Sequence, residues 1–300
     1  MQAGTIQNRP YEFMVKYTPQ REWIEGRGIL LLLAFFFVEL GAGAFIVASL
    51  YGNLTAAFIG WCLCGVVGSG CLFLHLGHPF RFWRMVLSPG WRTSWISRGL
   101  IFILLFLVLG GLHMILTLWA SPVPALLIVA CVFAFCTIAY VGFVMSYVNS
   151  IPLWNTPLLP VLYIVLGLWG GFGVTLLTLL GSGAGSETAG IEQGSRIFLV
   201  AFVFIVLLYL SGIRYQGATG KVSVREIVSG VAAPIFWVVV VFFGMALPLG
   251  VALGTWFLGL ALPGLLLSVV VLLELLGDLM FRYCILRCGF YAPLVPERVS

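Results

Sequence analysis

Eight apolar runs, each long enough to cross a bilayer, constrain the fold of this chain more than any other feature. The hydrocarbon core of a membrane is about 30 Å thick, and an α-helix needs about 20 apolar residues to span it. A mean hydropathy of +1.14 and a charged fraction of 8% agree with helices that face lipid. The sequence therefore predicts an all-α polytopic membrane protein, one integral domain over residues 1–300 with two four-helix bundles. The predicted spans lie at about 28–50, 54–74, 99–119, 123–147, 157–180, 196–213, 228–252 and 256–281.

The chain ends and the charged loops are predicted to lie outside the bilayer. Residues 1–27 are polar and contain no apolar stretch like that of a cleavable signal, so the first span directs insertion; residues 282–300 form a tail. Of the 15 Lys and Arg residues, 14 lie on the predicted face that holds both termini, and only Arg196 lies on the other. The positive-inside rule places that face in the cytoplasm. Binding of an acidic partner domain is a second explanation for the same arginines.

A basic and aromatic loop joins the second and third spans. Between His75 and Gly99 it carries four arginines and three tryptophans, a density that indicates a surface prepared to meet another molecule. The connection 152–160, PLWNTPLLP, lies on the same face. Its prolines make it rigid, Trp154 can anchor at the interface, and its lack of charge suits a surface covered by protein.

The cysteines and histidines do not form a recognisable metal site. No two of the seven cysteines have the C-x-x-C spacing of a cluster or zinc site, and five of them fall inside apolar spans. His75 ends the second span, whereas His113 lies about 20 Å deeper in the third, at 1.5 Å per helical residue. Two axial haem ligands must share a depth, so we expect no haem, no iron–sulfur cluster and no other metal in this chain.

Glu39 is an ionisable residue near the middle of the first predicted span, where a charge is costly. The small residues 41–44, GAGA, follow it and allow a helix or a flat ligand to approach closely. Two interpretations stay open: Glu39 handles protons or touches a ligand, or it is a hydrogen-bonded packing residue.

Two further groups inside the spans are candidates. Tyr140 lies at a depth of about 13 Å or less below the basic face, which a quinone head group can reach, although a tyrosine there also suits an interfacial belt. Glu274, Asp278 and Arg282 are spaced four residues apart on one helical face. They form either an internal ion-pair ladder or a proton path.

Together these motifs resemble the polysulfide-reductase membrane-subunit family, also called the NrfD-like family. The resemblance rests on HLGHPFRFWR at 75–84, TSWISRG at 93–99, YVGFVMSYVNS around Tyr140, PLWNTPLLP and RYCILRCGFYAP at 282–293. These motifs span nearly the whole chain and occur in the expected order with eight helices.

The resemblance implies a quinone-reactive anchor in the inner membrane of a prokaryote, without its own redox cofactor. In that family the anchor exchanges electrons between menaquinone or ubiquinone and a ferredoxin-like 4Fe-4S subunit. That subunit connects to a catalytic subunit, commonly a molybdopterin protein. No nucleic acid is expected as a partner. The family's quinone-associated tyrosine matches Tyr140, and Glu39 is the ionisable candidate for the polar residue of its first helix.

A mechanism follows from the chemistry of any quinone site, because quinone and quinol differ by two electrons and two protons. Each carbonyl needs a hydrogen-bond partner, and at least one group must exchange protons. We expect Tyr140 to support one carbonyl, His75 or Asn149 to lie near the other, and Glu39 to relay protons. Glu274 and Asp278 are further candidates for proton transfer.

The same resemblance gives the basic loop a role in docking the iron–sulfur subunit. Its arginines can pair with acidic side chains, and its tryptophans can be buried against the partner or anchor in lipid. The predicted docking residues are Arg81, Trp83, Arg84, Arg92, Trp95, Arg98 and Trp154. Contact with phospholipid headgroups is the competing explanation.

Two other classes of function remain open. A secondary transporter also has many helices and a few intramembrane charges, but it commonly shows broken helices in two matching halves. Here Pro234, Pro248 and Pro263 lie in the last two predicted spans without a matching set in the first half. An inert membrane anchor without quinone chemistry is the other alternative.

Overall fold

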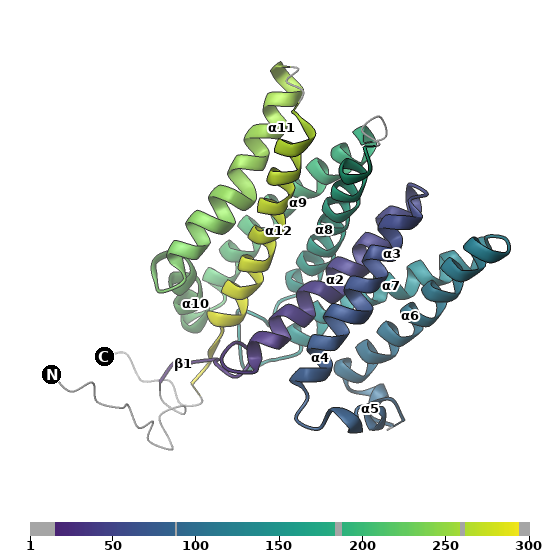
Figure 1. Ribbon diagram of the computed structural model, residues 1–300. Coiled ribbons are helices and arrows are strands. Elements are labelled where there is room, and N and C mark those ends of the chain that lie inside the picture. The colour runs from purple at the N-terminus through teal and green to yellow at the C-terminus, as the bar shows by residue number, and fades with distance from the viewer. Residues whose placement is uncertain (1–15, 88, 184–187, 259–261, 294–300) are drawn as a thin grey trace.

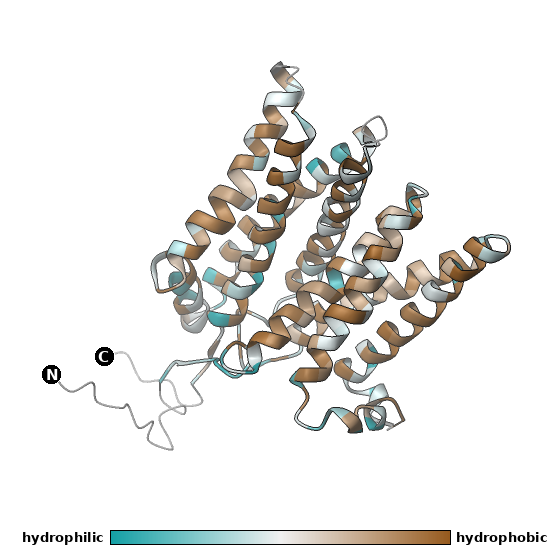
Figure 2. Cartoon of the chain, viewed as in Figure 1, coloured by the Kyte–Doolittle hydropathy of each residue, from teal (hydrophilic) through white to brown (hydrophobic). Residues whose placement is uncertain are grey.

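The computed structural model describes residues 16–87, 89–183, 188–258 and 262–293, and it confirms an all-α membrane fold with eight spanning helices (Figure 1). The helices are coloured largely as hydrophobic along their length, with hydrophilic residues concentrated toward their ends (Figure 2). Six of the described spans are single helices: α2 (Gly28–Leu50), α6 (Trp95–Trp119), α7 (Pro124–Ser146), α8 (Leu158–Ser182), α9 (Ala189–Tyr215) and α12 (Gly264–Arg287).

The second and seventh spans each contain a π-helical segment. The second consists of α3 (Leu54–Cys62), a π-helix over Leu63–Gly68 and α4 (Ser69–His75). The seventh consists of a π-helix over Ile235–Ala246 followed by α11 (Leu247–Leu258), and the eighth span is α12 (Gly264–Arg287). Such segments are often found at functional sites.

The eight helices form two groups of four in chain order. In the first group, α2 packs against the second span and against α7, and α6 packs against α7. In the second group, α8 packs against α9 and α12, and the seventh span packs against α12. Helices α2 and α8 form the most extensive helix–helix contact in the described part of the protein. The first four and the last four spans are therefore packed against each other as closely as the helices within either group.

Glycines allow α2 to approach its neighbours closely, as the GAGA run predicted. A Cβ atom on Gly43 would lie 1.9 Å from the Gly167 carbonyl oxygen of α8, and one on Gly41 would lie 2.4 Å from the Cys64 nitrogen. Gly60 faces Gly41 in the same way. A side chain at these positions would force the backbones apart, so small residues fix both helix contacts.

Several helices begin or end several residues away from the bounds predicted for their spans. The seventh begins at Ile235 rather than 228, because Ala218–Ser229 forms a separate helix, α10, with Lys221 and Arg225 on its more exposed side and Ile227 buried. The eighth runs to Arg287 rather than 281, so Arg282 is a buried helical residue and not part of a tail. The third begins earlier than predicted, at Trp95, because Ser94 caps it.

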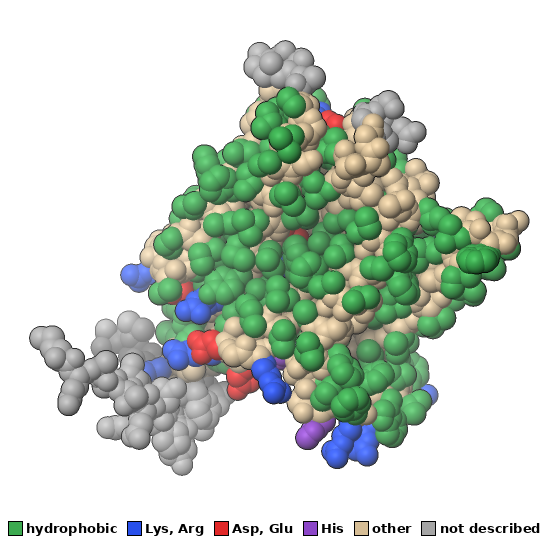
Figure 3. Space-filling view, in the orientation of Figure 1, with side chains coloured by type: hydrophobic (Ala, Val, Ile, Leu, Met, Phe, Trp, Pro, Cys, Tyr) green, Lys and Arg blue, Asp and Glu red, His purple; other side chains and the backbone are tan. Residues whose placement is uncertain are grey.

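Short elements lie together at one end of the bundle. A two-stranded antiparallel sheet joins β1 (Thr18–Pro19) to β2 (Phe290–Tyr291), and α5 (Trp83–Leu87) and α10 lie at the same end (Figure 1). Lys and Arg side chains gather there in the space-filling view, and a mainly hydrophobic surface separates them from the opposite end (Figure 3). The described part of the protein therefore has the one-sided charge that the sequence indicated. Arg282 is an exception because it is buried, and Arg9 and Arg298 lie outside the described residues.

Candidate functional site

A cavity of about 490 Å³ lies in the first helix group at the basic end. Helices α2, α4, α6 and α7 provide its walls, and Phe82 and Met85 of the basic loop also line it. Its polar side chains are Ser69, His75 and Tyr140, and the other lining residues are apolar or tryptophan. An apolar cavity of this size with a few convergent polar groups is typical of a small-molecule site.

Tyr140 lies on α7 and faces the cavity. Its side chain is buried, and its hydroxyl has no hydrogen-bond partner among the described residues. Gly99 of α6 makes room for the ring, since a Cβ atom there would lie 2.1 Å from a ring carbon of Tyr140. The free hydroxyl can therefore donate a hydrogen bond to a ligand carbonyl.

His75 lies at the end of α4 in the same cavity. Its Nδ1 is 3.0 Å from the carbonyl oxygen of Arg27, at the start of α2. With Nδ1–H donating to that carbonyl, Nε2 accepts a hydrogen bond in the neutral ring and donates one in the protonated ring. His75 and Tyr140 therefore line the same cavity.

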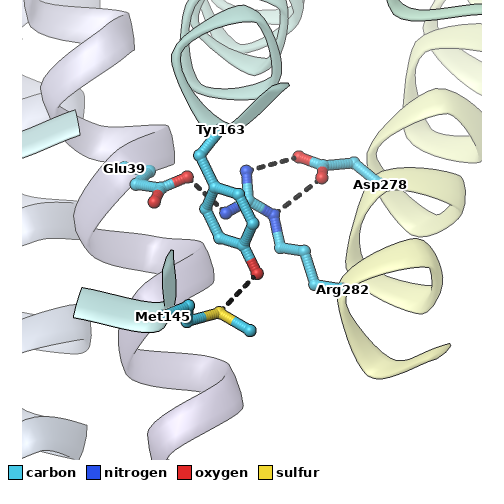
Figure 4. Close-up of polar contacts among 5 residues, drawn as sticks. All are labelled: Glu39, Met145, Tyr163, Asp278 and Arg282. Carbon is cyan, nitrogen blue, oxygen red and sulfur yellow. Dashed lines mark hydrogen bonds and ion pairs between the residues drawn. The ribbon is translucent and has the colours of Figure 1, made fainter. Parts of the chain in front are cut away.

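Glu39 does not line the cavity. It is fully buried on α2, and its Oε2 accepts a hydrogen bond from Arg282 of α12 (Figure 4). Its other oxygen, Oε1, has no hydrogen-bond partner among the described residues. Glu39 is nevertheless close enough to interact electrostatically with the phenol of Tyr140. It thus connects the neighbourhood of the cavity to a buried charge cluster.

The buried cluster consists of Glu39, Asp278, Arg282 and Tyr163. The Arg282 Nε donates to Asp278 Oδ1 at 2.7 Å, and the guanidinium lies 4.9 Å from the centre of the Tyr163 ring. The Tyr163 hydroxyl donates to the sulfur of Met145 at 3.0 Å (Figure 4). One arginine therefore compensates two carboxylates that come from both helix groups.

The predicted ladder of Glu274, Asp278 and Arg282 is only half present. Asp278 and Arg282 form an ion pair, whereas Glu274 lies next to Ser195 of α9. The predicted ladder did not include Glu39, the second partner of Arg282. A four-residue spacing identifies neighbours on one helix only, and Glu39 lies on another helix. The sequence did contain one signal: Arg282 follows an otherwise apolar segment, and an arginine buried there needs a carboxylate partner from another helix.

Two predicted site residues lie elsewhere. Asn149 is exposed and outside the cavity, and its Oδ1 accepts a hydrogen bond from Asn155 at 2.5 Å. Trp154 is 1% exposed, its Nε1 donates to the carbonyl of Ile285 at 2.9 Å, and its ring packs against Trp23. The prediction that Trp154 docks a partner is therefore wrong, because the side chain is part of the core.

The basic loop combines exposed and structural residues. Arg81, Trp83, Arg84 and Arg92 are exposed. Trp95 is half-buried and stacks on Phe143 of α7, with the ring centres 4.5 Å apart. Arg98 donates to the backbone carbonyls of Trp91 and Arg92 and lies over the Trp95 ring. Arg98 and Trp95 thus hold the loop against the helices, and the first four residues remain free to meet another molecule.

Comparison with known proteins shows the family. The pattern of the family described as "Polysulphide reductase, NrfD" matches residues 27–293, which include all eight spans. The protein belongs to the NrfD family. The C subunit of polysulfide reductase from Wolinella succinogenes is 29% identical over 292 residues, covering 85% of this protein and 91% of that subunit. Protein NrfD of Escherichia coli is 27% identical over 257 residues, covering 75% of this protein and 78% of its own length.

Membership in the NrfD family agrees with a subunit of a multisubunit oxidoreductase, since one relative is a subunit of polysulfide reductase by name. Within this NrfD-family protein, the described His, Cys, Asp and Glu side chains do not gather in a group of three or more that could hold a metal ion. Sequence reasoning missed several cavity residues, notably Trp23 and Phe35, because they carry no chemistry of their own. It also missed Gly99, whose role depends on the Tyr140 ring beside it.

Proposed function

We propose that this protein exchanges electrons between a membrane quinone bound in the cavity and an iron–sulfur subunit docked on the basic loop. One observation carries the proposal: Tyr140 and His75 line an apolar cavity that Phe82 and Met85 of that loop help to close. A partner on the loop would lie directly above the bound head group, so electrons would have a short path. The quinone is menaquinone or ubiquinone and acts as the substrate.

The residues have separate roles in this proposal. The Tyr140 hydroxyl donates a hydrogen bond to one quinone carbonyl, and His75 Nε2 serves the other. Oxidation of a quinol releases two electrons to the partner and two protons, so a nearby group must accept protons. His75 is the candidate at the basic end, and Glu39 is the candidate in the interior because its Oε1 has no partner.

The partners follow from the charge and position of the loop. Arg81, Arg84 and Arg92 suit acidic side chains on a ferredoxin-like 4Fe-4S subunit, with Trp83 available for burial at the contact. That subunit would connect to a catalytic subunit of the molybdopterin type. The protein lies in the inner membrane of a prokaryote, and the positive-inside rule places its termini in the cytoplasm.

Purification of the intact complex tests the proposal. We expect an organic extract to show the ultraviolet spectrum of a quinone, and mass spectrometry to identify an iron–sulfur subunit among the copurified proteins. Reproducible absence of quinone with all partners present would favour an inert anchor. A complex without any redox partner would favour a transporter.

A further inference from the structure

We propose that the gap between α4 and α6 holds the isoprenoid tail of the quinone, so that the substrate enters the cavity sideways from the lipid. This inference rests on the proposed function, because it assumes that a quinone head group occupies the cavity. The ligand is therefore a molecule with a planar head group and a long apolar tail. The head group lies in the cavity, and the tail lies in the adjoining gap.

The second and third spans touch in the middle of the bundle and separate toward the basic end. Their contact is made by Trp61, whose Nε1 donates to the Leu107 carbonyl at 2.9 Å, and by Gly65. A Cβ atom on Gly65 would lie 2.9 Å from the Leu107 side chain, so the helices are in close contact there. Beyond this point α4 packs against α2 and makes no comparable contact with α6 among the described residues.

The π-helical segment lies where the two helices separate. It covers Leu63–Gly68, and α4 begins at the next residue, Ser69, which lines the cavity. The Ser69 hydroxyl donates to the Cys64 carbonyl at 2.9 Å and so satisfies a backbone group within that segment. A π-helical turn changes the face that a helix presents, so α3 can face α6 while α4 faces the cavity.

The walls of the gap are apolar and reach the outer surface of the bundle. On the α6 side Ile96 is 52% exposed and Leu104 is 37% exposed, although both also line the cavity. On the α4 side the lining residues Leu72, Phe73 and Leu76 are only half-buried. The cavity is therefore continuous with the lipid-facing surface between these helices.

The sides of the cavity formed by α2 and α7 are closed. Leu31 and Phe35 on α2 and Val144 on α7 are buried, and the basic loop covers the end of the cavity. The cavity volume suits a head group, and a long isoprenoid tail must lie in surroundings as apolar as itself. The gap between α4 and α6 is the side of the cavity where exposed apolar walls lead into the bilayer.

A tryptophan at the rim tests the inference in the intact complex with its native partners. Leu104→Trp should narrow the gap, and Val108→Trp is the matched control because Val108 is 64% exposed on the same helix and does not line the cavity. Turnover is measured in liposomes with a long-chain menaquinol and with menadiol, which lacks the tail. Leu104→Trp should raise the KM for the long-chain quinol about tenfold more than the KM for menadiol. Val108→Trp should leave the ratio of the two KM values unchanged.

Photolabelling keeps the inference testable if the rim variant does not fold. A quinone with a photoreactive group on its tail should label α4 and the α6 residues 96–104 of the unmodified complex, and excess menadione should suppress that labelling. Competed labelling on other helices, or equal effects of Leu104→Trp on both quinols, would overturn the tail position while leaving the head-group site intact. Absence of any labelling that menadione suppresses would instead overturn the proposed quinone site.

Discussion

Arg282 of α12 donates a hydrogen bond to Glu39 of α2, which lies 243 residues earlier in the sequence. Because these helices belong to different groups of four, the contact ties the two halves of the membrane domain together. Asp278 occupies another part of the same guanidinium, so neither carboxylate is left without a cation. The cluster also places a buried acid within electrostatic range of Tyr140, which lines the cavity.

Removing the central cation should destabilise the bundle strongly. Arg282→Met leaves two buried carboxylates without compensation, and breaking a buried pair costs about 3–5 kcal/mol. We expect a large fall in the thermal unfolding temperature of the detergent-solubilised protein. A triple variant that also carries Glu39→Gln and Asp278→Asn should recover much of the loss, since it removes the uncompensated charges. A single variant as stable as the unmodified protein would show that the cluster does not join the two halves.

The close approach of α2 and α8 should not tolerate a side chain. Gly43→Val would place a Cβ atom 1.9 Å from the Gly167 carbonyl oxygen, and such overpacking costs about 1–3 kcal/mol or more. Gly250→Ala is the control, because a Cβ atom there meets no other atom within 4 Å. Unfolding in graded denaturant should distinguish the two variants. Equal midpoints would mean that the helix contact is not as tight as described.

The spans were predictable because bilayer thickness imposes a length and a composition on each helix. The sequence placed both His75 and Tyr140 toward the basic face, and the structure shows that they line the same cavity. Arg282 was misplaced in a tail because hydropathy treats an arginine as a boundary, whereas a carboxylate on a distant helix keeps it inside. Trp154 was assigned to the surface because the sequence alone does not distinguish an interfacial tryptophan from a buried one. Its packing against Trp23 is visible only in the structure.

The Tyr140 ring should be sensitive to its neighbour on α6. Gly99→Ala would place a methyl group 2.1 Å from a ring carbon and displace the hydroxyl. A misplacement of about 1 Å in a binding group can cost up to about 100-fold in activity. We expect quinol turnover to fall at least tenfold with normal assembly of the complex. Gly212→Ala, which meets no other atom, should behave like the unmodified protein, and an active Gly99→Ala complex would argue against the described ring position.

Charge reversal on the basic loop should weaken partner binding. Arg81→Glu and Arg84→Glu together replace two exposed cations with anions, so acidic groups on the iron–sulfur subunit would be repelled. Dissociation should become on the order of tenfold or more faster at low salt, with a smaller effect at high salt because ions screen exposed charges. Lys221→Glu with Arg225→Glu tests the neighbouring basic surface of α10. Equal weakening by both pairs would indicate general electrostatic attraction and not a docking site on the loop.

The most direct measurement compares two tyrosines of the same region in the assembled complex. Tyr140→Phe removes a hydroxyl that faces the cavity, whereas Tyr147→Phe removes one from an exposed side chain just beyond α7. Reduction of the partner's iron–sulfur cluster by menaquinol is followed by rapid-mixing spectroscopy. Loss of a hydrogen bond to the quinone should slow this step about tenfold in Tyr140→Phe, and Tyr147→Phe should match the unmodified complex. Equal rates in all three complexes would contradict a quinone site at Tyr140.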